Sequence, residues 1–308
     1  MKIAVIGAGF VGATTAQRLV ERNLGDVVLY DIVEGLPQGK ALDMMESAPI
    51  WGFESRVFGT NDPKDLSGSE IVVIASGMAR LPGMSRDDLL ERNAGIAASV
   101  ADQVREHAPQ AMVIVVTNPV DALTHLVAVK VGTPKARIFG MGGILDSARF
   151  RHFLASELGV AQADVDAMVL GGHGDDMVPL PRFATVNGVP IELLLPADQI
   201  QKLVTRTRDG GAEIVRYLKR GSAYYAPAAA IAQMVESVVR DQKRLLPCSA
   251  WCSGQYGITG QFVGLPVILG RSGVEKIVEL PLNAAELKDL QVSSSRVAAK
   301  VAKLQLAG

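Results

Sequence analysis

Residues 2–12 read KIAVIGAGFVG, and this stretch sets the expected fold. The apolar run at residues 2–6 predicts a β-strand, and a glycine hexad follows it and opens a helical pattern. Gly7 permits a tight turn, Gly9 lets the backbone approach a pyrophosphate, and Gly12 allows helix and strand to pack closely. The stretch therefore predicts a dinucleotide site at a helix N-terminus, although such a hexad by itself also occurs in ordinary strand–helix turns.

Asp31 is a second feature that favours dinucleotide binding. It ends the predicted strand 27–30, about 20 residues after the last glycine, where a carboxylate can accept hydrogen bonds from ribose hydroxyls. The same carboxylate would repel a 2′-phosphate, so we expect NAD rather than NADP. The alternative is that Asp31 caps a helix. We place Phe10 and Val11, inside the hexad, in the same cofactor site.

The first half of the chain alternates strands with helices. Each predicted strand is a nearly continuous apolar run, which is typical of a parallel sheet covered on both faces, and the runs are 2–6, 27–30, 71–75 and 112–116. Apolar residues at three- and four-residue spacing predict crossover helices at 11–22, 36–45, 89–107 and 120–129. This order predicts a Rossmann doubly wound parallel sheet.

The pattern changes after about Gly143. The following residues predict helices at 145–158, 199–218 and 284–304, and hairpins at 182–191 and 266–278. We therefore expect an α/β protein with an NAD-binding Rossmann domain at residues 1–143 and an α+β catalytic domain at residues 144–308.

Composition and charge exclude several classes of partner. The 308 residues carry a formal net charge of -1, which provides no long-range attraction for nucleic acid or an anionic membrane. No apolar run approaches the length of about 20 residues that crosses a bilayer, and residues 1–6 leave no room for a signal peptide, so we expect a cytoplasmic protein. Cys248 and Cys252 have no nearby cluster of histidines or cysteines, and we expect structural thiols and no metal site.

One of the four histidines stands out as an acid–base candidate. His107, His125 and His152 lie in helical patterns and are expected to be structural. His173 lies in LGGHGDD (residues 170–176), where three glycines disfavour a helix and let backbone and cofactor come close. An imidazole can both take and return a proton near neutral pH, so His173 is the expected acid–base group.

Such a histidine needs an orienting carboxylate, and Asp146 is a candidate. If residues 143–149 open a helix, Asp146 and Arg149 are three residues apart and share one face. Asp146 could then hold His173 while Arg149 binds an anion. The alternative is that Asp146 caps the helix N-terminus, and the residues alone do not decide between these roles.

Two more arginines, Arg80 and Arg86, lie in MARLPGMSR (residues 78–86), which leaves the carboxyl end of a predicted strand. Ligands of open α/β sheets bind at that end, and Pro82-Gly83 is typical of a mobile lid. Arginines on surface loops are more often simply solvated.

Taken together, these motifs resemble the lactate/malate dehydrogenase family, and within it the bacterial malate dehydrogenases that are similar to lactate dehydrogenases. The similarity covers essentially the whole chain. Besides the glycine hexad, Tyr30-Asp31 and the arginine loop, it includes GKALDM (39–44), RNAGI (92–96), TNPVD (117–121), LDSARFR (145–151) and GGHGD (171–175).

The resemblance implies a role for each matching residue. His173 would be the proton acceptor, Asp146 its partner, and Arg86 the residue that polarises the C2 oxygen of the substrate. Arg149 would bind the C1 carboxylate through a two-bond fork, the geometry that guanidinium suits best. For the remaining positions, the resemblance implies that Asn118 bonds substrate near the nicotinamide and that Val116 and Asn93 line the cofactor groove.

The resemblance also implies the reaction, which is reversible oxidation of (S)-malate to oxaloacetate with reduction of NAD. Arg80 carries the substrate choice, because malate dehydrogenases of the family have arginine there and lactate dehydrogenases have glutamine. Ala79 and Leu81, which flank Arg80, depart from the family pattern and remove a positive charge from the lid. The alternatives are a lactate or other 2-hydroxyacid dehydrogenase, or an NAD-binding sensor without catalysis. The family also implies a homo-oligomer, with a tetramer favoured over a dimer.

Overall fold

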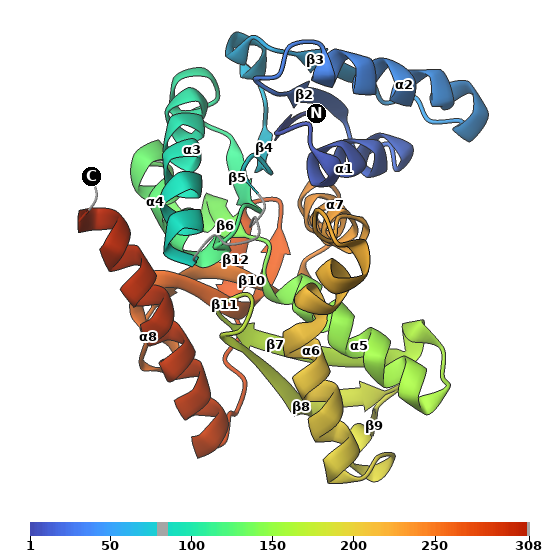
Figure 1. Ribbon diagram of the computed structural model, residues 1–308, viewed down its shortest axis with the longest axis vertical. Coiled ribbons are helices and arrows are strands. Elements are labelled where there is room, and N and C mark those ends of the chain that lie inside the picture. The colour runs from blue at the N-terminus through green and yellow to red at the C-terminus, as the bar shows by residue number, and fades with distance from the viewer. Residues whose placement is uncertain (79–85, 307–308) are drawn as a thin grey trace.

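The computed structural model describes residues 1–78 and 86–306, without the side chains of residues 86, 305 and 306 (Figure 1). Its first half contains six parallel strands in the order β3-β2-β1-β4-β5-β6. These strands are β1 (Lys2–Ile6), β2 (Asp26–Tyr30), β3 (Val57–Thr60), β4 (Ile71–Ile74), β5 (Met112–Val115) and β6 (Ile138–Gly140). The chain direction across the sheet reverses between β1 and β4, and the carboxyl ends of strands at such a switch point are where ligands bind.

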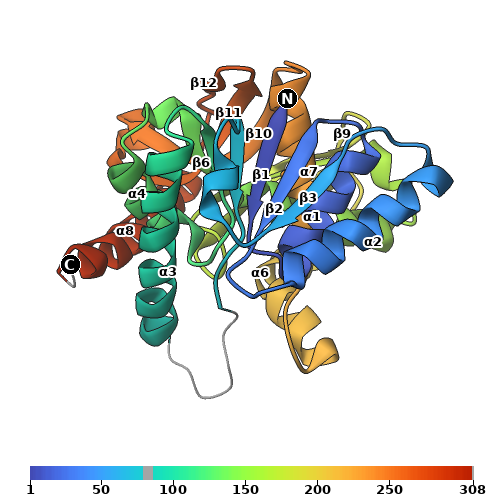
Figure 2. The same cartoon turned by 90° about the horizontal axis from the view of Figure 1, so that it is seen from above.

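Helices cover both faces of this sheet, which explains its apolar strands. The helices are α1 (Phe10–Glu21), α2 (Leu36–Trp51), α3 (Arg86–His107), α4 (Val120–Val131), α5 (Gly143–Leu158), α6 (Ala197–Leu218), α7 (Tyr225–Val239) and α8 (Ala284–Leu306). Helices α1, α2 and α7 cover one face, and α3 and α4 cover the other (Figure 2). Because both faces are buried, β4 is IVVI and each of its residues is almost fully shielded from solvent.

The second half of the chain forms antiparallel strands. These are β7 (Val165–Gly171), β8 (Met177–Val186), β9 (Val189–Pro190), β10 (Arg244–Ser253), β11 (Thr259–Gly270) and β12 (Gly273–Ile277). Strand β10 meets β6 where Ser249 pairs with Gly140, and β11 meets β7 where Gly264 pairs with Gly171. The antiparallel part therefore continues from the edge of the parallel sheet, and the β7–β8 connection lies close to the sheet's carboxyl edge.

The predicted fold class, a Rossmann sheet followed by an α+β part, is confirmed. The four predicted strands of the first half are present, and so is the hairpin at 266–278, formed by β11 and β12. The hairpin expected at 182–191 is longer on one side, because β8 begins at Met177. Strands β3, β6, β7 and β10 and helix α7 were not predicted. The division of the chain between residues 143 and 144 stays a prediction.

The described helices include none that is long and apolar enough to cross a membrane.

Candidate active site

The histidine loop consists of residues 171–176, which are the last residue of β7 and its connection to β8. It packs tightly against α8. Gly171 has a φ of +79°, and an added Cβ would lie 2.7 Å from Ser293 Oγ. A Cβ on Gly172 would lie 2.8 Å from a methyl group of Val297. Glycine is therefore needed at both positions, and the loop presents His173 with only 10% of its side chain exposed.

His173 and Asp146 form the central pair of the site. The Nδ1 atom of His173 lies 2.8 Å from Oδ2 of Asp146, and the Asp146 side chain is 1% exposed. Burial alone would lower the pKa of His173, but the Asp146 carboxylate, through its charge and its hydrogen bond, more than offsets burial and raises that pKa above its usual value. The pair can thus hold an imidazolium that forms during proton transfer.

The alternative role of Asp146, a helix cap, is wrong. The N-cap residue of α5 is Gly142, and Asp146 lies within the first turn. Its carboxylate instead joins two side chains, since Oδ1 also accepts a hydrogen bond from Nη1 of Arg149 at 3.3 Å. Asp146 therefore links the acid–base group to a cation on its own helix.

Arg149 has the features of an anion-binding residue. Its side chain is 13% exposed, and its Nε atom is buried without a hydrogen-bond partner among the described residues. Its side chain lies beside Gly210 and Gly211 of α6, where an added Cβ would be 3.2 Å from Arg149 Cδ and 3.7 Å from Nη2, respectively. A buried guanidinium donor without a partner fits a ligand carboxylate.

The glycine hexad has the geometry that a dinucleotide needs. Gly7 has a φ of +104°, and an added Cβ would lie 2.6 Å from the backbone nitrogen of Ser76. A Cβ on Gly12 would collide with the Gly7 carbonyl. At Gly9, by contrast, an added Cβ meets nothing within 4 Å, so the outer side of the turn is open. Gly9 also begins α1 without a side-chain cap, which leaves N–H groups available to a pyrophosphate.

Asp31 is tied to this turn and does not cap a helix. Its Oδ2 accepts a hydrogen bond from the backbone N–H of Ala8 at 2.6 Å, and its Oδ1 accepts one from Val33 at 3.0 Å. Helix α2 begins at Leu36, and its N-cap residue is Gly35, so no side chain caps it. Asp31 thus stands beside the open side of the hexad, and the described residues fit an adenine dinucleotide.

Phe10 is exposed and packs against a residue that the sequence did not point to. The residue is 68% exposed, and its ring stacks on that of Tyr224, which precedes α7, with centroids 5.1 Å apart. Lys40 lies over the Phe10 ring and donates a hydrogen bond to the carbonyl of Ala8 at 2.6 Å. No local pattern around Tyr224 could have indicated this contact, because more than 200 residues separate the two rings.

The residues expected beside the nicotinamide and along the cofactor groove differ in their exposure. Asn118 is exposed, whereas Asn93 and Val116 are buried. The Asn93 amide bonds the backbone of Met78 and donates to the Asn118 carbonyl at 2.8 Å. Asn93 therefore fixes the backbone that presents Asn118, while its direct contact with NAD stays a prediction.

Two of the predicted substrate-binding side chains are not among those that the structure describes. Arg80 belongs to the segment 79–85, which the structure does not describe, and Arg86 is the first residue of α3 but its side chain is likewise outside the described set. Their approach to His173 and the substrate stays a prediction.

The cysteines and the other histidines are apart from this site. Cys248 and Cys252 are free and buried, and burial raises the pKa of Cys248 to about 12, which suits an unreactive thiol. His125 packs against Trp251 and Phe262. Within residues 1–78 and 86–306, no group of His, Cys, Asp or Glu side chains could hold a metal ion.

Side chains of helix α8 bind the histidine loop through hydrogen bonds and ion pairs. Ser293 Oγ accepts a hydrogen bond from Gly172 N at 2.8 Å and donates one to the Asp176 carbonyl at 2.5 Å. The Asp176 carboxylate pairs with Arg296 at 3.1 Å and with Lys300 at 2.7 Å. Three side chains of one helix thus hold the loop that carries His173.

These ion pairs predict a pH-dependent contribution to stability. Burial works against the Asp176 carboxylate, but Lys300 and Arg296 outweigh it and lower the pKa of Asp176. A carboxylate whose pKa is lowered by folding stabilises the fold at pH values above its unfolded-state pKa. This stabilisation is lost as pH falls through the folded-state pKa. Asp176→Asn should therefore reduce the free energy of unfolding at pH 7. The loss should be only about 1 kcal/mol, because solvent screens the exposed Arg296. Urea unfolding should give the same difference between wild type and variant at pH 5 and a smaller difference below pH about 4. A difference that does not depend on pH would contradict this prediction.

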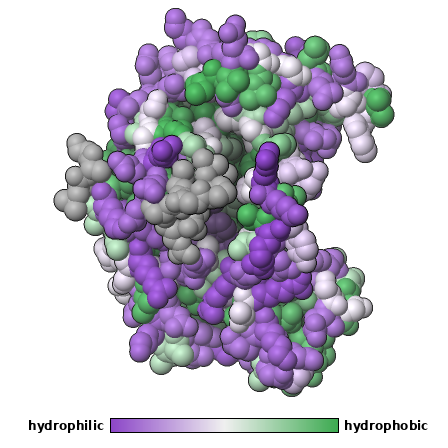
Figure 3. All heavy atoms as spheres, in the orientation of Figure 1, coloured by the Kyte–Doolittle hydropathy of each residue, from purple (hydrophilic) through white to green (hydrophobic). Residues whose placement is uncertain are grey.

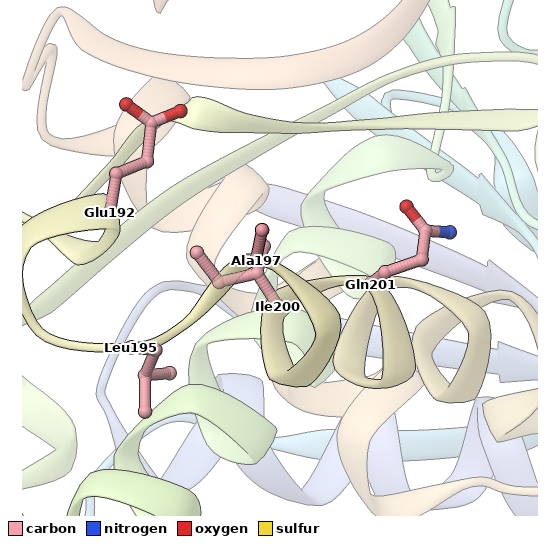
Figure 4. Close-up of a pocket in the computed structure, with 5 residues that line it drawn as sticks. All are labelled: Glu192, Leu195, Ala197, Ile200 and Gln201. Carbon is pink, nitrogen blue, oxygen red and sulfur yellow. The ribbon is translucent and has the colours of Figure 1, made fainter.

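A cavity of about 290 Å³ lies elsewhere, at the start of α6. Figure 4 shows its lining, in which Ala197, Ile200 and Gln201 come from the first turns of α6, and Glu192 and Leu195 precede them. Glu192 and Gln201 lie at opposite ends of this lining and do not converge on one ligand atom. None of the predicted site residues lines it.

Comparisons with known proteins agree with this geometry. Residues 1–140 match the family model for the lactate/malate dehydrogenase NAD binding domain, and residues 144–305 match the model for its alpha/beta C-terminal domain. The malate dehydrogenase of Chloroherpeton thalassium is 54% identical to the chain over 298 residues, which is 96% of each protein.

Solved structures point the same way. The apo malate dehydrogenase of Picrophilus torridus is 47% identical and superposes with a TM-score of 0.96, covering 99% of this chain and 97% of that one. A lactate dehydrogenase of Cryptosporidium parvum, solved with lactic acid and NAD, is 45% identical with a TM-score of 0.95 and covers 99% of this chain and 98% of that one. The backbone alone therefore does not separate the two activities.

Proposed function

The chain belongs to the lactate/malate dehydrogenase family, and from this premise we propose that His173, Asp146 and Arg149 form its catalytic centre. Its activity is the NAD-dependent interconversion of (S)-malate and oxaloacetate. The observation that carries the assignment of residues is the Asp146 carboxylate, which joins His173 on one oxygen to Arg149 on the other.

His173 is the acid–base group. With its Nδ1 held by Asp146, its Nε2 atom takes the hydroxyl proton of malate, and it returns a proton to the carbonyl oxygen in the reverse direction. Asp146 stabilises the charged imidazole in both directions. NAD, when bound, would supply the acceptor for the hydride of malate C2.

Arg149 and Asn118 orient the substrate. The Nε atom of Arg149, which has no hydrogen-bond partner among the described residues, and the Nη atoms provide a fork for the C1 carboxylate. Exposed Asn118 bonds the substrate near the nicotinamide. Gly7, Gly9, Phe10, Val11, Gly12 and Asp31 hold the dinucleotide, with Asn93 and Val116 behind it. Asp31 favours NAD over NADP because its charge repels a 2′-phosphate.

Arg80 selects the dicarboxylic substrate, and Arg86 polarises the C2 oxygen. Closing the lid on oxaloacetate buries a second carboxylate that needs a cation, whereas pyruvate would leave Arg80 buried and unpaired. Replacing Arg80 by Gln should lower kcat/KM for oxaloacetate by about 10³-fold and change that for pyruvate far less. Arg56→Gln, at an exposed arginine, is the control and should change neither value. Equal losses for both keto acids would refute the role of Arg80.

A direct assay tests the substrate assignment. We expect NADH oxidation with oxaloacetate to exceed that with pyruvate by about 10³-fold in kcat/KM under the same conditions. A preference for pyruvate would make the protein a lactate dehydrogenase. No loss of NADH absorbance with any 2-keto acid would leave an NAD-binding protein without catalysis.

We also propose a homotetramer in the cytosol. The exposed apolar side chains include Leu42, Ile50 and Trp51 on α2, and Tyr217 and Tyr225 on α6 and α7. Figure 3 shows apolar atoms at the surface in the upper part of the molecule, where Figure 1 has α2. Two such surfaces support two kinds of isologous interface, which a closed tetramer uses. Sedimentation velocity would measure whether the protein is a tetramer. The free cysteines support the proposed location, because thiols stay reduced in the cytosol.

A further inference from the structure

Asp121 is a buried carboxylate beside the site that the reaction described above does not use. It lies in the first turn of α4 and is 5% exposed. Its Oδ2 accepts a hydrogen bond from the backbone N–H of His173 at 2.8 Å. Its Oδ1 accepts one from the Ser249 hydroxyl at 2.6 Å. The carboxylate thus ties the histidine loop to α4 and β10.

Asp121 does not serve its own helix. The N-cap of α4 is Pro119, and no side chain caps it. Both partners of Asp121 donate hydrogen bonds, because the His173 amide can only donate and the Ser249 hydroxyl is free to do so. This arrangement suits an ionised carboxylate, and the N-terminal end of α4 stabilises negative charge as well.

We propose that Asp121 is a positioning residue for the proton transfer, in that its buried carboxylate fixes the main chain of His173 and adds a second negative charge near the imidazole. Asp146 holds the ring, and Asp121 holds the backbone from which the ring projects. The inference rests on the proposed role of His173 and goes beyond it, because Asp121 acts through the backbone of His173 and is given no role in binding substrate or cofactor.

The charges around His173 agree with this role. Helix α5 contributes Asp146 and Arg149, helix α4 contributes Asp121, and Lys300 of α8 acts on Asp121. Burial raises the pKa of Asp121 above its usual value, and the hydrogen bonds from Ser249 and His173 offset only part of that rise. Of these groups, Asp146 and Asp121 favour the protonated imidazole, whereas Arg149 disfavours it.

The test uses two variants of the full-length protein. Asp121→Asn keeps the size and an acceptor for the His173 amide but removes the charge. We expect the acidic midpoint of kcat/KM for malate oxidation to move down by at least about half a pH unit, because the imidazole loses a stabilising anion. Asp121→Ala removes both hydrogen bonds, and we expect kcat to fall by at least about tenfold with KM for malate and NADH affinity little changed.

Thr124→Val is the matched control, since it removes a buried hydrogen bond in the same helix, from Thr124 Oγ1 to the Val120 carbonyl at 2.7 Å. It should lower thermal stability without moving the pH midpoint. If Asp121→Ala does not fold, Asp121→Asn decides alone, and an unchanged midpoint would overturn the proposal.

The failure of this inference differs from the failure of the proposed function. A wild-type protein that does not oxidise malate would refute the function. The pKa of His173 can still be followed through its Cε1 proton by NMR, with the resonance assigned from a His173→Asn variant. An equal NMR midpoint in wild type and Asp121→Asn would overturn the role of Asp121 regardless of activity.

Discussion

Replacing His173 by asparagine is expected to lower kcat for malate oxidation by about 10³-fold or more, while the affinity for NADH stays unchanged. Asparagine retains a polar side chain but cannot take the substrate proton, and it leaves Asp146 without the imidazole that it stabilises. The dinucleotide loop is formed by other residues, so cofactor binding should survive. Steady-state rates and NADH fluorescence titration measure the two effects separately.

His152→Asn is the matched control, because it makes the same change at an exposed histidine of α5. It should leave kcat unchanged. A His173→Asn variant with a rate close to that of wild type would remove His173 from the mechanism.

Arg149→Lys is expected to lower kcat/KM for oxaloacetate by about 10³-fold, although the positive charge remains. A lysine offers one point of attachment where the guanidinium offers a fork, and its ammonium would not reproduce the Arg149 contact with Asp146. The variant should lose affinity for the substrate carboxylate and also the alignment of C2 with His173, so both KM and kcat should change. Steady-state kinetics with varied oxaloacetate separate the two.

Arg206→Lys on α6 is the corresponding control. Arg206 also forms a two-bond fork with a carboxylate, that of Glu213, but at an exposed position. Its replacement should leave kcat/KM unaltered. Equal and small effects of the two substitutions would contradict the role given to Arg149.

The dinucleotide turn could be predicted from sequence because its parts are contiguous. Strand β1, the hexad and helix α1 follow one another, and the constraint on Gly12 comes from the backbone of Gly7 in the same hexad, although the constraint on Gly7 comes from Ser76 after β4. Strands β3 and β6, by contrast, are four and three residues long and contain glycine, so their apolar patterns are too short to stand out.

The contact between His173 and Asp146, the proposed catalytic pair, could be established only from the folded structure. His173 and Asp146 are 27 residues apart, and the residues around Asp146 were compatible with a capping role. Only the packing of the β7–β8 connection beside the first turn of α5 places the carboxylate against the ring. The family resemblance gave the correct pairing where local spacing could not.

Other contributors were missed because their roles depend on distant partners. Asp121 is a single acidic residue at the start of an apolar helix, a signal that could have prompted a search for a buried partner. Two successive glycines, Gly210 and Gly211, interrupt a helical pattern and make room for Arg149. Neither feature of the sequence indicates which distant residue it contacts.

The pH dependence of malate oxidation in wild type and in Asp146→Asn tests the central pair most directly. Because malate oxidation needs neutral His173, kcat/KM should rise with pH through the raised pKa of that residue. Asp146→Asn removes the charge that raises this pKa, so the midpoint should move to lower pH and the plateau rate should fall. An identical midpoint and plateau in the two proteins would contradict the account.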